Sequence, residues 1–160
     1  LLPSKKNCQI CCMLSLNFPR YSFRFKSSEN KQQIFDIIRK KFVSLLPEEW
    51  VRQHVIHFLT IDKKYPTSLI NVEKTLSLNG LKKRYDVVVY KSDGSIHILV
   101  ECKSPNITIS QVVFDQIARY NLKMQAEYLM VTNGLDHFYC KMNYEEEKYS
   151  FLRQIPDFSR

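Results

Sequence analysis

Residues 84–90, Arg-Tyr-Asp-Val-Val-Val-Tyr, precede an Asp93-Gly94 pair and residues 96–103, Ile-His-Ile-Leu-Val-Glu-Cys-Lys. Both runs are rich in β-branched and aliphatic residues, and Asp-Gly is a preferred turn pair of β-hairpins. If Asp93-Gly94 forms a two-residue turn, Asp86 lies directly opposite Glu101. Opposed residues have Cβ atoms about 4.5 to 5.5 Å apart, close enough for two carboxylates to hold one hard cation.

Cys102 and Lys103 come directly after the second of these acids. Because side chains alternate along a strand, Lys103 shares the face of Glu101, whereas Cys102 points away and can present its carbonyl oxygen. Two adjacent carboxylates repel each other unless a cation lies between them. Bound Mg²⁺ would coordinate a phosphate oxygen and lower the pKa of a water molecule, which is the equipment for phosphodiester hydrolysis. The alternative is an ordinary ion pair between Asp86 and Lys103 at a solvated strand end.

The remaining patterns predict an α/β fold. Helices are expected over residues 31–46, where apolar residues recur at helical spacing after Ser28 or Asn30 as the N-cap, from Pro47 to about Leu59, and from near Ser110 to near Gln125. Further strands are expected over residues 69–78, 128–131, 138–142 and 149–152, with turns at Asn79-Gly80 and Asn133-Gly134. The predicted architecture is a central mixed sheet flanked by helices, with an N-terminal helical segment.

The length of 160 residues fits a single domain. Residues 1–12 differ in character from the rest of the chain, which suggests a non-native or disordered leader and a natural start at Met13. Residues 13–160 are expected to form one domain, with a core over about 48–142, and contain neither repeats nor an internal linker.

The chain is basic, with a formal net charge of +8, and its surplus is concentrated before residue 65. Such a surplus suits a polyanionic partner, although a generally soluble basic surface explains it equally well. No apolar run approaches the roughly 18 residues that span a bilayer, so no membrane association and a cytoplasmic location are expected.

The five cysteines show no pattern of a disulfide-bonded secreted domain and are interpreted as reduced thiols. Cys8 and Cys11 have the spacing of half a zinc site, but no second pair of ligands occurs at the usual distance. His54 and His57 also have ligand spacing but lack a third ligand, so packing is the favoured interpretation.

Gln116 and Tyr120 lie four residues apart, which places them on one face of the third predicted helix, either as contacts to a sugar-phosphate backbone or as half-exposed packing. Together with residues 84–86, 101–105, 115–121 and 131–134, they resemble the PD-(D/E)XK nuclease superfamily. The specific resemblance is to the nuclease domain at the N-terminus of type I restriction enzyme R subunits, and it covers roughly residues 48–133.

This resemblance implies a restriction-endonuclease-like core in which Asp86 and Glu101 hold Mg²⁺, with Mn²⁺ as a substitute, and Lys103 serves the attacking water. It also implies that Gln116 and Tyr120 form a Q-x-x-x-Y element that contacts the sugar-phosphate backbone. Tyr85 stands where the superfamily name has proline, a departure that this subgroup often shares. The chain contains no segment that could be the ATP-driven translocase, so a stand-alone relative is expected.

Several further residues are candidates for the same site. Glu73 is a candidate third acidic ligand, or else a surface acid. Candidates for contact with DNA phosphates, with plain surface charge as the alternative interpretation, are Arg52, Lys82, Lys83, Arg84 and Arg119. Arg52 has a second alternative, which is to bind a carboxylate.

The function predicted from the sequence is Mg²⁺-dependent hydrolysis of DNA by a metal-activated water molecule. The alternative is a catalytically silent protein that binds nucleic acid, or an assembly module that uses the sheet edge near Tyr149 to Phe151. Expected partners are DNA and, for assembly, either a second copy of the chain or a separate motor or methyltransferase subunit.

Overall fold

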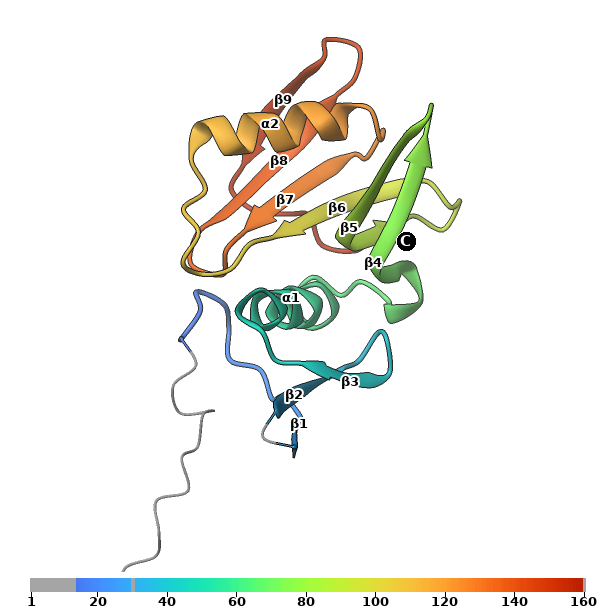
Figure 1. The fold of residues 1–160 in the computed structure, drawn as a ribbon. Coiled ribbons are helices and arrows are strands. Elements are labelled where there is room, and N and C mark those ends of the chain that lie inside the picture. The colour runs from blue at the N-terminus through green and yellow to red at the C-terminus, as the bar shows by residue number, and fades with distance from the viewer. Residues whose placement is uncertain (1–13, 30, 160) are drawn as a thin grey trace, which may run out of the picture.

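The computed structural model describes residues 14–29 and 31–159, drawn in colour in Figure 1. The strands are β1 (Phe25–Ser28), β2 (Lys31–Asp36), β3 (Lys41–Ser44), β4 (Ile70–Leu78), β5 (Leu81–Tyr90), β6 (Ile96–Cys102), β7 (Tyr128–Thr132), β8 (His137–Asn143) and β9 (Lys148–Leu152). The helices are α1 (Pro47–His57), which continues into a π-helical turn (Phe58–Asp62), a short 3-10 turn (Thr67–Leu69) and α2 (Gln111–Leu122).

The main sheet has six strands in the order β4-β5-β6-β7-β8-β9. Only β6 and β7 pair in parallel, and α2 connects them, because parallel neighbours need a crossover. The helices α1 and α2 lie on opposite faces of this sheet (Figure 1). The predicted α/β architecture with a central mixed sheet flanked by helices is confirmed.

Two hydrophobic cores result, one on each face of the main sheet. The core on the α1 face contains Val51 and Val55 of the helix with Val87, Val89 and Val100 of the sheet. The core on the α2 face contains different side chains of the same strands, among them Val88 and Leu99, packed against Phe114 and Ala118. The continuous apolar runs of β5 and β6 reflect this burial on both faces.

The predicted N-terminal helix over residues 31–46 is wrong, because this segment forms β2 and β3 of a three-stranded antiparallel sheet. The turn between the strands explains the error. The buried carboxylate of Asp36 accepts backbone hydrogen bonds from Ile38 and Arg39, at 2.8 and 2.6 Å, and this local bonding competes with a helix. Lys40 closes the turn with a positive φ of 53°.

The other predicted elements are confirmed with small shifts at their ends. The helix α1 begins at Pro47, and α2 begins after Ser110, whose hydroxyl accepts the Val113 backbone hydrogen bond at 3.3 Å. The Asn79-Gly80 turn joins β4 to β5 directly, since Leu78 pairs with Leu81. The proposed leader and the Cys8 and Cys11 pair lie outside the described residues.

The helix α1 lies between the two sheets, so that even its polar side chains are buried (Figure 1). The Nδ1 atoms of His54 and His57 donate to the carbonyl oxygens of Trp50 and Gln53, each at 2.9 Å. Both rings also pack against Phe23, with centroids 4.7 and 4.6 Å away. Packing is therefore the role of these histidines, and among residues 14–29 and 31–159 no group of three or more His, Cys, Asp or Glu side chains is arranged as a metal cage.

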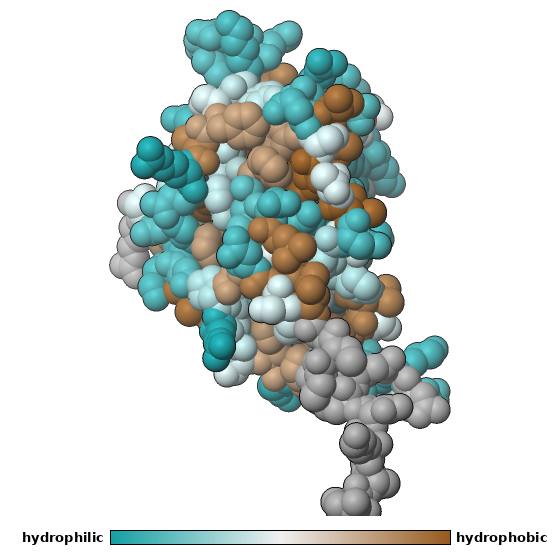
Figure 2. Space-filling view, turned by 90° about the vertical axis from the view of Figure 1, so that its left-hand side faces the viewer, coloured by the Kyte–Doolittle hydropathy of each residue, from teal (hydrophilic) through white to brown (hydrophobic). Residues whose placement is uncertain are grey.

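The surface mixes hydrophobic and hydrophilic residues on the face turned to the left of Figure 1, as the brown and teal atoms of Figure 2 show. An apolar groove of about 480 Å³ lies between the start of α1 and the segment after β6; it is lined by Leu14, Leu45, Leu46, Pro47, Trp50, Ser104, Pro105 and Asn106. In the described part of the chain, no helix is long and apolar enough to cross a membrane.

Replacing Gly134 by alanine is expected to destabilise the fold. Gly134 has a φ of +87°, and a Cβ atom there would lie 2.8 Å from Leu16 Cδ2 and 3.1 Å from Val51 Cγ2. The left-handed backbone costs about 1–2 kcal/mol for a residue with a side chain, and overpacking adds about 1–3 kcal/mol. Urea unfolding of Gly134→Ala should therefore show a loss of about 2–5 kcal/mol.

The matched control is Gly80→Ala, because Gly80 has a similar φ of +79° but no atom within 4 Å of the added Cβ. This variant should lose only the conformational part, about 1–2 kcal/mol. Equal losses in the two variants would contradict the packing role assigned to Gly134.

The stability of the fold is expected to fall as the pH drops below about 6.5, the ordinary histidine pKa. Burial lowers the pKa of His54 to about 4, so the unfolded chain binds more protons than the folded chain between these values. The stability present above pH 6.5 is thus lost progressively toward pH 4, by up to about 3 kcal/mol for this residue. Urea midpoints from pH 7 to pH 4.5 should fall less steeply in His54→Asn than in the wild type, and parallel curves would contradict this assignment.

Candidate functional site

The hairpin of β5 and β6 has the register that the sequence predicts. Val87 pairs with Val100, so Asp86 and Glu101 occupy the next positions along the two strands. The predicted two-residue turn is wrong, since the Gly94 backbone donates to the Lys91 carbonyl and Lys91 pairs with Ser95, which leaves three residues in the loop. An irregularity between Val89 and Tyr90 shifts the pairing by one residue and restores the predicted register.

Asp86 lies at a break in the pairing of β5 with its other neighbour. Glu73 on β4, the residue opposite, has a left-handed φ of 52°, and the ladder omits this pair. Tyr85 consequently packs on the α2 face while Val87 packs on the α1 face. Between them, the Asp86 carboxylate accepts a hydrogen bond from the Cys102 backbone N–H and another from Arg52 Nη2, each at 2.7 Å.

Glu101 is buried beside Asp86, with 9% of its side chain exposed. Desolvation raises the pKa of this carboxyl, the ion pair with Lys83 lowers it, and the neighbouring Asp86 carboxylate raises it again; the net direction is upward. A carboxyl group whose pKa responds to a second carboxylate lies close to it. The register and this electrostatic coupling both place the two acids beside each other at the end of the hairpin.

Lys83 places its ammonium group between this pair and α2. It pairs with Glu101 and lies over two aromatic rings, 4.6 Å from the centroid of Tyr85 and 4.9 Å from that of Tyr120. The hydroxyl of Tyr85 is buried, and within the described residues it has no hydrogen-bond partner. Tyr120 thus brings α2 to the site through Lys83, a link that the sequence does not indicate.

The end of β6 carries the other predicted residues. The Cys102 N–H points toward Asp86, and in an extended strand the carbonyl of the same residue points the same way. The Lys103 backbone N–H donates to the Thr132 carbonyl at 2.8 Å. Its half-buried side chain forms no ion pair among the residues that the structure describes, so its ammonium group has no carboxylate partner there.

The predicted DNA contacts fall into three groups by exposure. Gln116, Arg119, Lys82 and Arg84 are exposed, and Lys83 and Tyr120 are half-buried and contact each other. Arg52 is buried and pairs with Asp86 and Glu49, so its carboxylate-binding alternative is what the structure shows. Burial lowers the pKa of Arg52, but these carboxylates outweigh burial and raise it overall. A DNA contact by Arg52 would require these ion pairs to break.

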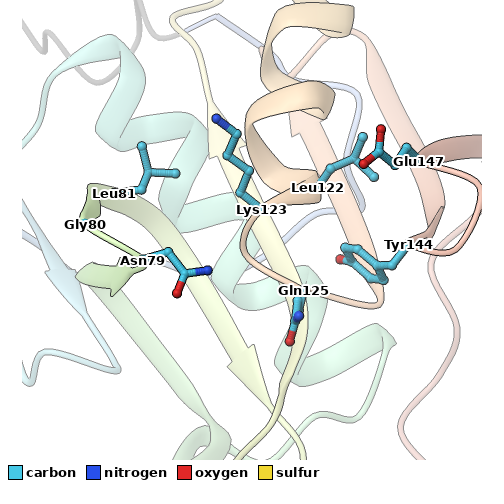
Figure 3. Close-up of a pocket in the computed structure, with 8 residues that line it drawn as sticks. All are labelled: Asn79, Gly80, Leu81, Leu122, Lys123, Gln125, Tyr144 and Glu147. Carbon is cyan, nitrogen blue, oxygen red and sulfur yellow. The ribbon is translucent and has the colours of Figure 1, made fainter.

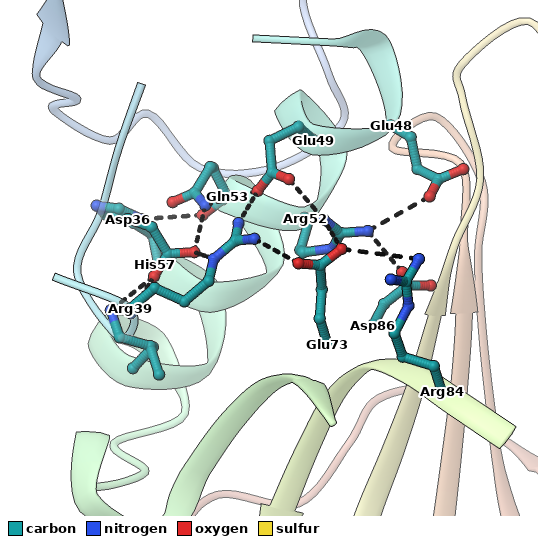
Figure 4. Close-up of polar contacts among 11 residues, drawn as sticks. Asp36, Arg39, Glu48, Glu49, Arg52, Gln53, His57, Glu73, Arg84 and Asp86 are labelled. Atoms are coloured by element: carbon teal, nitrogen blue, oxygen red, sulfur yellow. Dashed lines mark hydrogen bonds and ion pairs between the residues drawn. The ribbon is translucent and has the colours of Figure 1, made fainter. Parts of the chain in front are cut away.

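A network of ion pairs connects Asp86 to the N-terminal sheet (Figure 4). Glu49 of α1 binds Arg52 and also Arg39, and Glu73 contacts the same two arginines, at 3.7 Å from Arg52 and 2.8 Å from Arg39. Arg39 continues to Asp36 at 2.8 Å, and Asp36 is fully buried. Glu73 is therefore engaged by arginines, one of which, Arg52, it shares with Asp86.

Three residues of this network are missed by the sequence reasoning: Asp36, Arg39 and Glu49. Asp36 and Arg39 fall in the segment with helical spacing, where a separation of three residues looks like ordinary helix surface. Only the burial of Glu49 and Gln53 inside α1 could have indicated a polar network, and burial is not visible in the sequence.

A pocket of about 640 Å³ lies at the end of α2, close to the β4–β5 turn (Figure 3). It lies between the β4–β5 turn, the end of α2 and Tyr144. Two leucines line it: Leu81, two residues before Lys83 on β5, and Leu122, two residues after Tyr120 on α2. Lys83 and Tyr120 contact each other. The pocket therefore opens near the Lys83–Tyr120 contact, without either residue lining it.

Residues 47–156 match the family described as type I restriction enzyme R protein N terminus (HSDR_N). A structure described as a fragment of an HsdR subunit of a type I restriction enzyme from Vibrio vulnificus YJ016 is 20% identical, with a TM-score of 0.49. The match covers 71% of this chain but only 24% of that chain. No curated protein matches the sequence. The family match confirms the resemblance inferred from the sequence.

Replacing Arg52 by methionine should destabilise the fold strongly, because it leaves the buried carboxylates of Glu49 and Asp86 without this cation. Removal of one partner from a buried ion pair costs about 3–5 kcal/mol. Arg84→Met is the control, since its side chain is 67% exposed and contacts Glu73 only at 3.9 Å, and it should cost less than about 1 kcal/mol. Similar urea midpoints for the two variants would contradict the role of the network.

Proposed function

Because the chain belongs to the family of type I restriction enzyme R protein N termini, we propose that it is a Mg²⁺-dependent nuclease domain that hydrolyses DNA phosphodiester bonds. The observation that carries the proposal is the adjacency of Asp86 and Glu101, which occupy the positions next to the Val87–Val100 pair at the end of the β5–β6 hairpin, with Lys103 two residues after Glu101.

The donor set fits a hard divalent cation. Two carboxylates and a backbone carbonyl are oxygen ligands of the kind that Mg²⁺ and Mn²⁺ prefer. Asp86, Glu101 and the Cys102 carbonyl would hold the ion, and the Cys102 N–H fixes the orientation of the Asp86 carboxylate. When bound, the ion would polarise the phosphate and supply an activated water molecule.

The residues around this set have separate roles in the proposed reaction. Lys103, which lacks an internal carboxylate partner in the described part of the chain, would orient the attacking water or balance the charge that develops on the phosphate. Gln116 and Arg119, both exposed on α2, would contact the DNA backbone, as would Lys82 and Arg84 on β5. Contacts of this kind position a duplex without reading its sequence.

One observation favours a second candidate, a protein that binds nucleic acid without cleaving it. Asp86 and Glu101 both have cationic partners inside the chain, Arg52 and Lys83, so their charges are balanced in part without a metal ion. A site of this composition could persist after loss of catalysis. The chain would then serve to bind nucleic acid, or to assemble with a second copy or with a separate motor or methyltransferase subunit.

The test is cleavage of plasmid, linear and single-stranded DNA by the purified chain, with Mg²⁺, with Mn²⁺ and with chelator. Asp86→Asn, Glu101→Gln and Lys103→Met should each reduce metal-dependent cleavage by at least about a hundredfold, because each removes either a ligand of the ion or the ammonium group that serves the attacking water. Circular dichroism and thermal unfolding establish that each variant is folded.

Asp157→Asn is the matched control, since it removes the same charge from a side chain that is 71% exposed and pairs with Lys63. Metal-dependent cutting that survives in all three site variants would remove the assignment. Intact DNA under every condition, together with binding that weakens as salt rises, would favour the second candidate.

A further inference from the structure

Lys83 holds one of the two carboxylates that the proposed function assigns to the metal ion. Its ammonium group pairs with Glu101, and the Arg52 guanidinium pairs with Asp86. A divalent cation that bound both carboxylates would lie a few ångströms from two positive charges. Because like charges at such distances repel, these side chains oppose the entry of the ion unless one of them moves.

The cluster nevertheless has an excess of negative charge. Its largely buried acids are Asp36, Glu49, Glu73, Asp86 and Glu101, and its bases are Arg39, Arg52 and Lys83. Five acids against three bases leave two negative charges when all are ionised, and one divalent cation would balance them. The total charge thus favours such an ion, while the carboxylate oxygens that it would use are engaged.

The two cationic partners differ in how firmly they are held. Arg52 has 7% of its side chain exposed, and Glu49, itself held by Arg39, fixes it on the side away from Asp86. Lys83 has 23% exposed, and Glu101 is its one carboxylate partner in the described residues. Its other neighbours are the ring faces of Tyr85 and Tyr120, which attract an ammonium group without fixing its position.

Lys83 is also open to solvent in part, with 23% of its side chain exposed. The pocket at the β4–β5 turn is lined by Leu81, two residues before Lys83 on the same strand, and by polar side chains, although Lys83 is not one of its lining residues. A flexible four-carbon stem can turn toward this pocket while the ammonium group stays hydrated. Arg52, buried between α1 and the main sheet, has no such path.

We propose that Lys83 is a positioning residue of the site, an internal counter-ion that holds Glu101 while no divalent cation is bound and releases it when the ion binds. This inference rests on the proposed function, because it assigns the ion to Asp86 and Glu101. It adds that the affinity of the site for the ion is set in part by the loss of the Lys83–Glu101 pair.

The test is a titration of the full chain with Mn²⁺, in which the electron paramagnetic resonance signal reports the free ion. Lys83→Met should bind Mn²⁺ about tenfold more tightly than the wild type, because the variant removes a positive charge near the ion and frees Glu101. Lys83→Arg, which keeps the charge, should return the affinity toward the wild-type value. Lys74→Met, at an exposed position opposite Tyr85, should change it less than about twofold.

Equal or weaker Mn²⁺ binding by Lys83→Met would overturn this inference. Glu101→Gln tests the proposed function separately: if it leaves Mn²⁺ binding unchanged, the ion lies elsewhere and that function fails. If neither the wild type nor Lys83→Met binds Mn²⁺, both are overturned. Thermal unfolding gives a second readout, since Lys83→Met should gain a larger rise in Tm from Mn²⁺ than the wild type.

Discussion

The arrangement of the site depends on how the Asp86 carboxylate is held. One of its oxygen atoms accepts the Cys102 backbone N–H of the neighbouring strand, and the other accepts Arg52 of α1. These bonds require Asp86 to leave the regular alternation of β5, which the left-handed backbone of Glu73 on β4 permits by interrupting the ladder. The local break between β4 and β5 thus lets the Asp86 carboxylate connect the hairpin to α1. Further ion pairs extend this connection to the N-terminal sheet.

The hairpin was predictable because its register follows from simple alternation. Two apolar runs around an Asp-Gly pair place Asp86 beside Glu101, and the observed register agrees. The loop is one residue longer than predicted, but a compensating irregularity next to Tyr90 cancels the shift. Burial of one hydrophobic set on each face explains this compensation, because a one-residue slip would turn every side chain of the strand to the wrong face.

The N-terminal sheet was not predictable from the same kind of pattern. Its apolar residues coincide with helical spacing only because a turn separates two short strands, and the turn is specified by hydrogen bonds of the Asp36 side chain. Glu49 and Arg52, three residues apart on α1, look like an exposed surface pair in the sequence. They are buried in the structure because Glu49 also pairs with Arg39 of the N-terminal sheet region, a tertiary contact that the sequence does not reveal.

The enclosure of α1 has a consequence for the mechanics of the chain. A helix that buries polar and apolar side chains against both sheets cannot separate from either one without exposing charged groups that have lost their partners. The backbone amides of α1 should therefore exchange with solvent only when the molecule opens globally, and the small sheet and the large one should behave as a single cooperative unit.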